Sequence, residues 1–339
     1  MLTFFIAVWK VSNFTDNENI ASTEWIVVRQ REITTEYLRY SLMAPYFRNL
    51  LQSNVSGVGG SLTRAKPREV RNYVLPIPPL SEQSRIAAKI AQLFALLRKV
   101  ESSTQQYAQL QTLLKSKVLD LAMRGKLVEQ DPHDEPASVL LEKIKAEKEQ
   151  LVKEGKIKKS KPLPPIVDDE KPFDIPDSWE WVRLGDIIEL VSGRDIAKKY
   201  HLSHKIHNAT PYITGASNID DKGNITINEW IDNPSVVVTK GTLLLSVKGT
   251  IGKIAILQLP KAHIARQIMG IENIYNFNQD FQKYFLESYI GELKRKAKSM
   301  IPGISRDDII LAPFSFSPLI EQNKITNKIK KLFSLEIGE

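Results

Sequence analysis

A repeated stretch of sequence constrains the fold of this 339-residue chain more than any other feature. Pro79–Gln83 (Pro-Leu-Ser-Glu-Gln) recurs as Pro318–Gln322 (Pro-Leu-Ile-Glu-Gln), about 240 residues later. The match continues to Leu93-Phe94, which align with Leu332-Phe333, and it persists upstream with small gaps. The repeat predicts one structural unit that occurs twice, and its first copy starts only partway through the unit.

A long helix is predicted directly after the first Pro-Leu-x-Glu-Gln motif. Neither Gly nor Pro occurs between Ser81 and Arg124, and Gly125 suits a C-terminal cap. A helix of this length reaches about 66 Å at 1.5 Å per residue. Apolar residues follow a spacing of three or four along it, broken only at Thr104 and Gln111: Ile86, Ile90, Leu93, Leu97, Val100, Tyr107, Leu114, Val118 and Leu121. Such a rod cannot bury this seam alone, so we expect a coiled coil with another helix, and an ordinary core helix is the alternative.

The rest of the chain predicts an α+β fold. A turn at Asp131–Pro136 precedes an amphipathic helix at Ala137–Lys153, and Lys156–Pro176 has the composition of an extended linker. Four short apolar runs with glycines between them indicate strands: Ile187–Val191, Val236–Val238, Thr242–Val247 and Ile254–Leu257. Helical character returns near Gln279–Lys298. The apolar run Leu2–Trp9 is too short to span a bilayer and is interpreted as a buried strand.

These patterns divide the chain into five predicted segments. They are a partial first copy of the repeated unit (1–79), a long helix (80–125), a turn with a short helix and linker (126–175), a second copy of the unit (176–318) and the start of a second long helix (319–339). The chain contains no cysteine, which excludes disulfides and thiolate metal sites and favours a cytoplasmic protein. The net charge of +8 is compatible with phosphate binding but is spread thinly along the chain.

No motif supports an active site, and we expect neither a metal nor a cofactor in this chain. Lys248–Lys253 resembles a phosphate-binding loop, but only two residues separate its glycines where the P-loop needs four, so we interpret it as a turn between strands. His201, His204 and His207 lack the further ligands that zinc requires. A nuclease would need carboxylates such as Asp220 and Asp307, and both lie in turn-like contexts.

DNA binding needs basic groups for phosphates and polar side chains for base edges. The candidates are Arg194, Lys198, Lys199, Tyr200, Lys248, Lys253, Arg266 and Gln267. Arginine and glutamine can pair bidentately with guanine and adenine respectively, which makes Arg266 and Gln267 the candidates for reading bases. Lys294-Arg295-Lys296 is a further basic cluster that we interpret as the solvated face of a helix.

Several stretches share their order and spacing with one known family. They are Pro79–Gln83, Gly125–Val128, Asp134–Ala137, Ile175–Asp186, Gly249–Gly252 and Gly303–Ser305. Together they resemble the specificity subunit of type I restriction-modification enzymes. The resemblance implies two target-recognition domains, each reading half of a bipartite site in double-stranded DNA, with long antiparallel helices as the ruler between them. It also implies methyltransferase (M) and restriction (R) subunits as partners, which bind S-adenosylmethionine, ATP and magnesium and carry out catalysis.

The sequence departs from the family pattern at two places. The alignment of the two copies puts Met1 just after the counterpart of Gly249–Gly252, and the second long helix stops at Glu339. We therefore expect either a truncated subunit or chains that complete one another through the long helix. The alternatives are a scaffold or inactive remnant that binds the methyltransferase subunit without reading sequence, and an independent metal-dependent nuclease.

Overall fold

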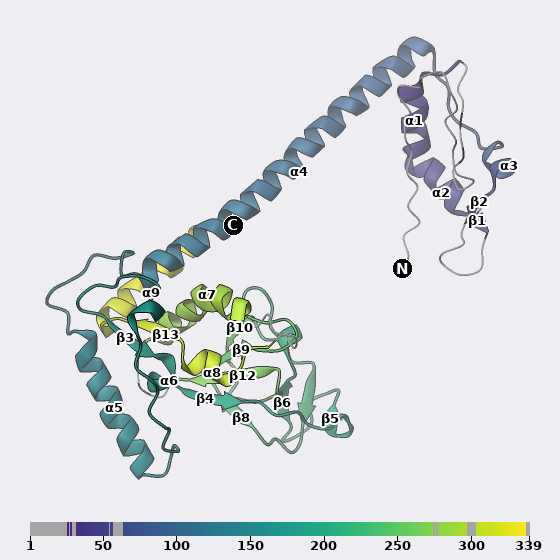
Figure 1. Cartoon of the computed structure of the whole chain (residues 1–339). Helices are drawn as coiled ribbons and strands as arrows, with labels where there is room; N and C mark the ends of the chain where they lie inside the picture. The colour runs from purple at the N-terminus through teal and green to yellow at the C-terminus, as the bar shows by residue number, and fades with distance from the viewer. Residues whose placement is uncertain are drawn as a thin grey trace. The chain divides into compact units, whose positions relative to one another are not determined.

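The computed structural model describes residues 26, 28, 32–53, 55–56, 64–273, 275, 277–296 and 303–336. The chain forms two compact units, Met1–Gln109 and Leu110–Glu339 (Figure 1). The predicted strand Leu2–Trp9 lies outside the described residues. Across the described ranges, no helix combines the length and the apolar character that a membrane span requires.

The first unit packs short helices around the beginning of a long one. It contains α1 (Thr35–Met43), α2 (Pro45–Ser53), β1 (Val55–Ser56), β2 (Arg64–Ala65), α3 (Pro67–Val70) and the first part of α4 (Leu80–Met123). Its buried apolar side chains include Tyr37, Leu38, Phe47, Leu51 and Ala87. The Tyr37 hydroxyl donates to the Pro76 carbonyl at 2.7 Å, and the Phe47 and Tyr73 rings meet edge to face at 5.6 Å. These contacts hold the segment before α4 against α1 and α2.

Helix α4 confirms the predicted long helix, and Gly125 ends it. The Lys126 N–H donates to the Leu121 carbonyl at 2.8 Å, and the Gly125 N–H donates to the Ala122 carbonyl at 3.2 Å. This pair of bonds is the Schellman cap, which needs a left-handed residue at the position of Gly125, where φ is +66°. An added Cβ there would also lie 2.5 Å from Pro176. Glycine is therefore required both for backbone conformation and for space.

The predicted seam of α4 is buried only near the end of the helix. Val118 is 6% exposed and shares a hydrophobic cluster with Ile325 and Ile329 of α9 (Leu319–Glu336). Ile86, Ile90 and Leu121 are half-buried. The remaining seam residues are exposed: Leu93, Leu97, Val100, Tyr107 and Leu114. A continuous apolar stripe of this kind on a helix is typical of a surface that another helix covers.

In the second unit, α5 (Ala137–Lys153) has the predicted limits. The segment from 156 to 176 is irregular apart from a 3-10 turn at Asp168–Glu170, and it is fastened to the domain by Arg183. The Arg183 guanidinium is 5% exposed, pairs with Glu170 at 2.6 Å and donates to the carbonyls of Pro164, Pro165 and Leu311. The predicted linker is therefore bound along its second half.

Two sheets form the centre of the second unit. The first is antiparallel, in the order β10 (Ile254–Ile256), β9 (Leu243–Ser246), β12 (Ile268–Glu272), β4 (Glu189–Ser192). The second has the order β5 (His201–Leu202), β7 (Glu229–Ile231), β6 (Thr210–Ile213), β11 (Lys261–Ile264), β8 (Val237–Thr239), and only β6 and β11 run parallel. A separate pair joins β3 (Glu180–Arg183) to β13 (Pro313–Phe316). This mixture of sheets and helices confirms the α+β prediction.

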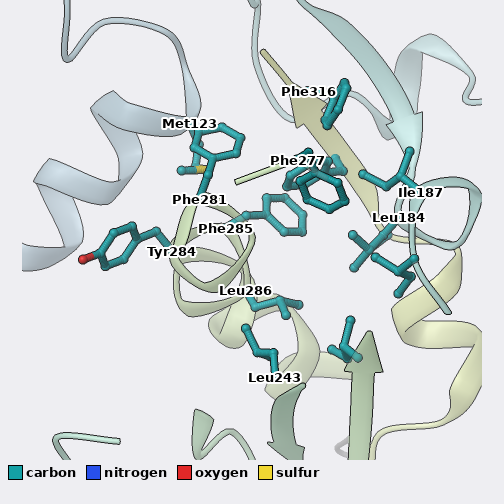
Figure 2. Close-up of a cluster of buried hydrophobic side chains, with 14 of the residues drawn as sticks. Met123, Leu184, Ile187, Leu243, Phe277, Phe281, Tyr284, Phe285, Leu286 and Phe316 are labelled. Atoms are coloured by element: carbon teal, nitrogen blue, oxygen red, sulfur yellow. The ribbon is translucent and has the colours of Figure 1, made fainter. Parts of the chain in front are cut away.

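Strand β9 separates two hydrophobic cores because its side chains alternate between the faces of the sheet. Leu243 and Leu245 lie in the core formed with α7 (Gln279–Lys296), α8 (Arg306–Ile310), α9 and β13, whereas Leu244 lies between the two sheets. Figure 2 shows the first core, in which Phe277, Phe281, Phe285 and Phe316 from α7 and its surroundings gather beside Leu184 and Ile187. Both faces of the sheet are thus covered by hydrophobic cores.

The predicted strand Ile187–Val191 begins two residues too early. Ile187 ends α6 (Leu184–Ile187), a single helical turn, and β4 starts at Glu189. Leu184 and Ile187 are 0% and 1% exposed, and a helical turn is the conformation that directs residues three apart into one core. The apolar pattern alone does not distinguish these two buried conformations.

The internal repeat is also present in the hydrogen bonds. Gln83 accepts from the Thr34 N–H at 2.8 Å and donates to the Pro78 carbonyl at 2.9 Å. Gln322 accepts from the Asn278 N–H at 2.9 Å and donates to the Ser317 carbonyl at 2.8 Å. In each copy, the buried glutamine of Pro-Leu-x-Glu-Gln thus ties the start of its own helix, α4 or α9, to the start of an earlier helix, α1 or α7.

Candidate nucleic-acid interface

Three connections meet at one end of the two sheets. The β9–β10 turn contacts the β11–β12 turn through the Val247 N–H, which donates to the Gln267 carbonyl at 2.8 Å. The segment after β4 joins the same β11–β12 turn, because the Arg194 N–H donates to the Ile264 carbonyl at 2.9 Å. These bonds bring together the sequence-predicted Arg194, Lys248, Arg266 and Gln267. We refer to the residues 193–195, 247–253 and 265–267 as the loop end.

Arg266 is held at the loop end by a carboxylate from the neighbouring segment. Its Nε lies 2.7 Å from Asp195 Oδ2, and its backbone N–H donates to Asp195 Oδ1 at 3.1 Å. The Arg266 side chain remains 68% exposed. The Arg266 side chain therefore projects into solvent, while Asp195 fixes its backbone N–H and its Nε.

His263 joins these segments from beneath. It is fully buried; its Nδ1 accepts from the Val236 N–H at 3.1 Å, and its Nε2 donates to the Arg194 carbonyl at 2.7 Å. Burial lowers the pKa of His263, and a neutral ring matches one nitrogen that accepts and one that donates. Sequence reasoning missed this residue, because a single histidine within a strand carries no signal of its role.

Gln267 lies beside a second connection, the one that follows β6. Its Oε1 is 2.5 Å from the position that a Cβ on Gly215 would occupy, so a larger residue there would displace the end of the Gln267 side chain. Asn218 shapes that connection, since its Oδ1 accepts from the N–H groups of Thr214 and Gly215 and its Nδ2 donates to Thr226. Asn218 is a further residue that the sequence analysis missed, although asparagine after glycine is a typical turn signal.

The β9–β10 connection is the predicted turn between strands. Gly249 and Gly252 have φ values of +71° and +92°, in the left-handed region that glycine favours. The buried Ser246 hydroxyl donates to the Thr250 carbonyl at 2.8 Å and accepts from the Lys253 N–H at 2.8 Å, which closes the turn from inside. Lys248 is exposed, whereas Lys253 is half-buried and forms an ion pair with Asp221.

The cluster Lys198, Lys199 and Tyr200 forms a 3-10 turn further along the segment after β4. All three residues are exposed, and the Lys199 ammonium lies 4.9 Å from the centroid of the Tyr200 ring. The next residue, His201, anchors the turn: its Nε2 lies 2.9 Å from the Ile196 carbonyl and its Nδ1 lies 2.8 Å from Glu229 Oε2. The cluster thus offers a cationic and aromatic surface on the same segment as Arg194.

The carboxylates considered for a nuclease lie in a turn and at the start of a short helix. Asp220 accepts hydrogen bonds from the Asn224 side-chain amide and from the backbone N–H groups of Asn224 and Lys222, and these bonds lower its pKa. Asp307 lies in α8, whose N-terminus is capped by Ser305 and Asp308. Within the described part of the chain, no group of three or more His, Asp or Glu side chains is arranged to hold a metal.

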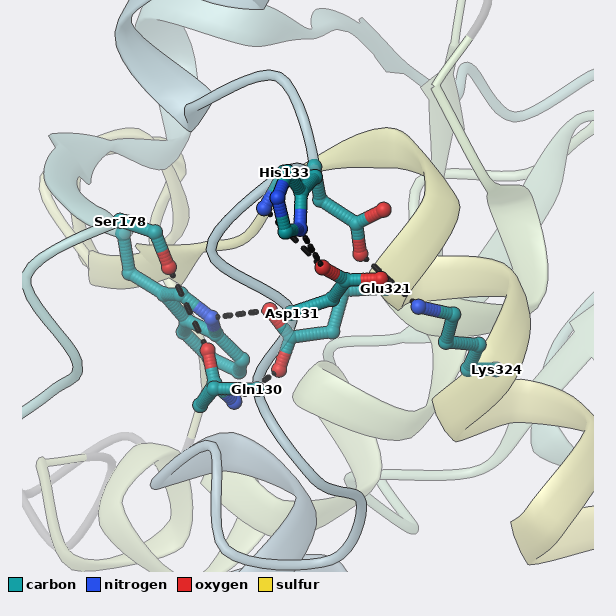
Figure 3. Close-up of polar contacts among 8 residues, drawn as sticks. Gln130, Asp131, His133, Ser178, Glu321 and Lys324 are labelled. Atoms are coloured by element: carbon teal, nitrogen blue, oxygen red, sulfur yellow. Dashed lines mark hydrogen bonds and ion pairs between the residues drawn. The ribbon is translucent and has the colours of Figure 1, made fainter.

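The repeated motif builds a second, structural site, which Figure 3 shows. Glu321 is 2% exposed and accepts from the Trp179 indole N–H at 2.7 Å and from Gln130. Burial raises the pKa of Glu321, and these two hydrogen bonds oppose that shift. Lys324, one turn later in α9, pairs with Asp134 at 2.9 Å. The site fastens α9 to the turn after α4 and to Trp179.

Comparison with known proteins identifies the second unit. Residues 176–338 match the family model for the type I restriction modification DNA specificity domain. These residues are similar to that domain family. The chain is 31% identical over 370 aligned positions to the specificity subunit of the type I restriction enzyme EcoAI from Escherichia coli, covering 92% of this chain and 62% of that protein. It is 37% identical over 213 positions to the EcoEI specificity subunit from the same organism, covering 50% of this chain and 36% of that protein.

Solved structures share the fold. The structure reported as "Structural basis underlying complex assembly and conformational transition of the type I R-M system" matches with a TM-score of 0.61 and 22% identity, over 90% of this chain and 64% of that one. The HsdS subunit from Thermoanaerobacter tengcongensis matches with a TM-score of 0.51 and 21% identity, over 89% and 63%. The predicted resemblance to type I specificity subunits is confirmed, and the chain spans about six tenths of the length of the EcoAI subunit.

Proposed function

We propose that this chain reads DNA sequence as the specificity subunit of a type I restriction-modification complex. The observation that carries the proposal is the loop end, where Arg266 and Gln267 project beside Arg194 and Lys248 from a domain of the DNA specificity family. Donors and acceptors on flexible polar side chains are what base-edge recognition requires. Methyltransferase (M) and restriction (R) subunits then supply catalysis, in keeping with relatives that are named as specificity subunits of restriction enzymes.

The candidate residues divide by chemistry. Arg194, Lys198, Lys199 and Lys248 are exposed cations suited to phosphate contacts, which contribute affinity without sequence information. Tyr200 adds an exposed ring to this surface. Arg266 and Gln267, adjacent in one tight turn, are suited to base edges. Lys253 would first have to exchange Asp221 for a phosphate, so we expect it to contribute least.

The repeat supports a bipartite target, with one unit for each half. Under this proposal α4 sets the spacing between the halves, since 44 residues of helix extend about 66 Å. The exposed stripe on α4 then packs against a helix of a partner, either a second copy of this chain or another subunit of the complex. Leu97 and Val100, which are 49% and 61% exposed, are the centre of that stripe in the first unit.

Selection of DNA from a random pool tests sequence reading. The chain is co-expressed with its methyltransferase subunit, and selection is done at near-physiological salt, because phosphate contacts alone weaken steeply as salt rises. We expect a short motif to be enriched, and we expect the double variant R266A/Q267A to lose it. The matched control is Q258A/K261A, which changes exposed residues at the opposite end of β11 and should keep the motif.

The outcomes separate recognition from scaffolding. A stable complex with the methyltransferase subunit that enriches no motif would make this chain a scaffold or remnant and would end the recognition proposal. A motif that R266A/Q267A still enriches would move the reading surface away from the loop end.

The partner of the helical stripe is tested independently of DNA. Light scattering across a range of concentrations gives the mass of the chain alone and with the methyltransferase subunit. We expect L97E/V100E to weaken either self-association of the chain or its binding to the methyltransferase subunit, because two charges would be buried at the interface of α4. The control Q105E, elsewhere on the exposed part of α4, should leave it intact. Equal masses for both variants would show that the stripe is not an interface.

A further inference from the structure

We propose that Arg266 reads a guanine and that Asp195 is the residue that orients it for this task. The inference rests on the proposed function and adds to it the identity of one base and a positioning residue. Asp195 contacts both the Nε and the backbone N–H of Arg266, through different carboxylate oxygens. These two contacts fix the backbone and the Nε of Arg266, whereas its two terminal nitrogens have no part in them, and the side chain is 68% exposed.

Asp195 is itself well placed to hold an arginine, because its segment lies directly on the β11–β12 turn. The Gly193 N–H donates to the Ile268 carbonyl at 3.3 Å, and the Arg194 N–H donates to the Ile264 carbonyl at 2.9 Å. The buried His263 bonds to the Arg194 carbonyl from the other side. A Cβ on Gly193 would lie 2.1 Å from the Ala265 carbonyl oxygen, so this close approach needs glycine. The segment and the turn therefore act as one platform.

The carboxylate also decides what kind of ligand Arg266 suits. An arginine paired with an aspartate carries little net charge, so its attraction to a phosphate is weak. The pair keeps the N–H donors of the guanidinium, and a planar fork of such donors matches the O6 and N7 acceptors of guanine in the major groove. Adenine presents a donor in place of O6 and would be rejected. Arg194 and Lys248, which are exposed beside this pair, are better suited to the phosphates.

Base analogues distinguish guanine reading from phosphate contact. In the motif selected by the complex with the methyltransferase subunit, each guanine is replaced in turn by 7-deazaguanine, which lacks N7, and by inosine, which keeps both O6 and N7. We expect one guanine at which 7-deazaguanine weakens binding about tenfold or more, while inosine has little effect. R266A should lose the difference between guanine and 7-deazaguanine at that position.

The role of Asp195 is read from its own variant. D195N should reduce discrimination at that same guanine about tenfold. The salt dependence of binding to unrelated DNA should not weaken and should become steeper, since no phosphate contact is lost and Asp195 no longer neutralises Arg266. R266K should reduce the discrimination similarly, because it keeps the charge but loses the fork. D232N is the matched control, since Asp232 is an exposed aspartate after β7, at the far end of β6 from Gly215, and should keep full discrimination. Thermal unfolding of each variant establishes that it is folded.

Two results would overturn the inference while leaving sequence reading intact. In the first, every guanine of the selected motif tolerates 7-deazaguanine. In the second, R266A loses discrimination at a guanine that D195N and R266K both still read fully. If the wild-type complex enriches no motif, then the proposed function fails and the inference fails with it.

Discussion

The substitution G193A tests whether the segment after β4 and the β11–β12 turn form one platform. An added Cβ would lie 2.1 Å from the Ala265 carbonyl oxygen and 2.7 Å from the Ile264 carbonyl oxygen, both backbone atoms that cannot rotate away. The two segments must then separate by about 1 Å, which costs about 1–3 kcal/mol as overpacking. The hydrogen bonds from Gly193 and Arg194 to this turn are weakened as well, at about 1 kcal/mol each. We expect a loss of about 2–5 kcal/mol.

Hydrogen exchange followed by mass spectrometry is the suitable assay, because peptides covering 261–272 report on this region alone. We expect the exchange of these amides in G193A to be faster by about 30-fold or more, since each 1.4 kcal/mol is tenfold. The matched control is G291A on α7, where no atom lies within 4 Å of the added Cβ. Alanine favours the helix there by about 1 kcal/mol, so α7 should become no less protected. The reasoning would be refuted if G193A exchanged as slowly as the wild type.

Three further predictions concern the buried polar contacts. Because burial raises the pKa of Glu321, the stability that the protonated form contributes is complete below pH 4.5 and is lost as the pH rises through the raised folded pKa. In urea unfolding, E321Q should therefore gain stability relative to the wild type as the pH rises. A stability difference that does not change with pH would contradict this. W179F removes the indole donor to Glu321 and should lower the free energy of unfolding by about 1.5–3 kcal/mol, but by less in the E321Q background. If the two losses are additive in a double-mutant cycle, the two side chains are not coupled. R183M should lower the free energy of unfolding by about 3–5 kcal/mol and expose 156–171 to limited proteolysis by trypsin. The control K171M removes an exposed ion pair with Asp168 and should lower it by at most about 1 kcal/mol. Equal cleavage of the two variants would argue against the anchoring role of Arg183.

Some features of this protein follow from local sequence alone. The limits of α4 and α5 could be predicted because a helix is decided by residues within a few positions of one another. The signals in α4 are a 3–4 apolar spacing with two breaks, the lack of Gly and Pro, and a glycine at the required left-handed cap. The repeat was equally visible, and the equal bonds of Gln83 and Gln322 explain why both copies keep a glutamine. The turn at Gly249 and Gly252 was recognised because tight turns need glycine at fixed places.

Other features were decided only by the tertiary structure, because they depend on residues that are distant in sequence. Asp195 and Arg266 are 71 positions apart, and Trp179 and Glu321 are 142 apart, so no local pattern announces either pair. The start of β4 was predicted incorrectly for the same reason: Ile187 packs in a core that also includes residues of α8 and β13, and it ends α6 instead of beginning the strand. Sequence could nominate Arg266 as a basic side chain, but only the packing of the β4 segment on the β11–β12 turn places a carboxylate beside it. That neighbour lowers the net charge of the pair and holds the Nε of Arg266, and these two effects are the basis of the proposal that Arg266 reads a base.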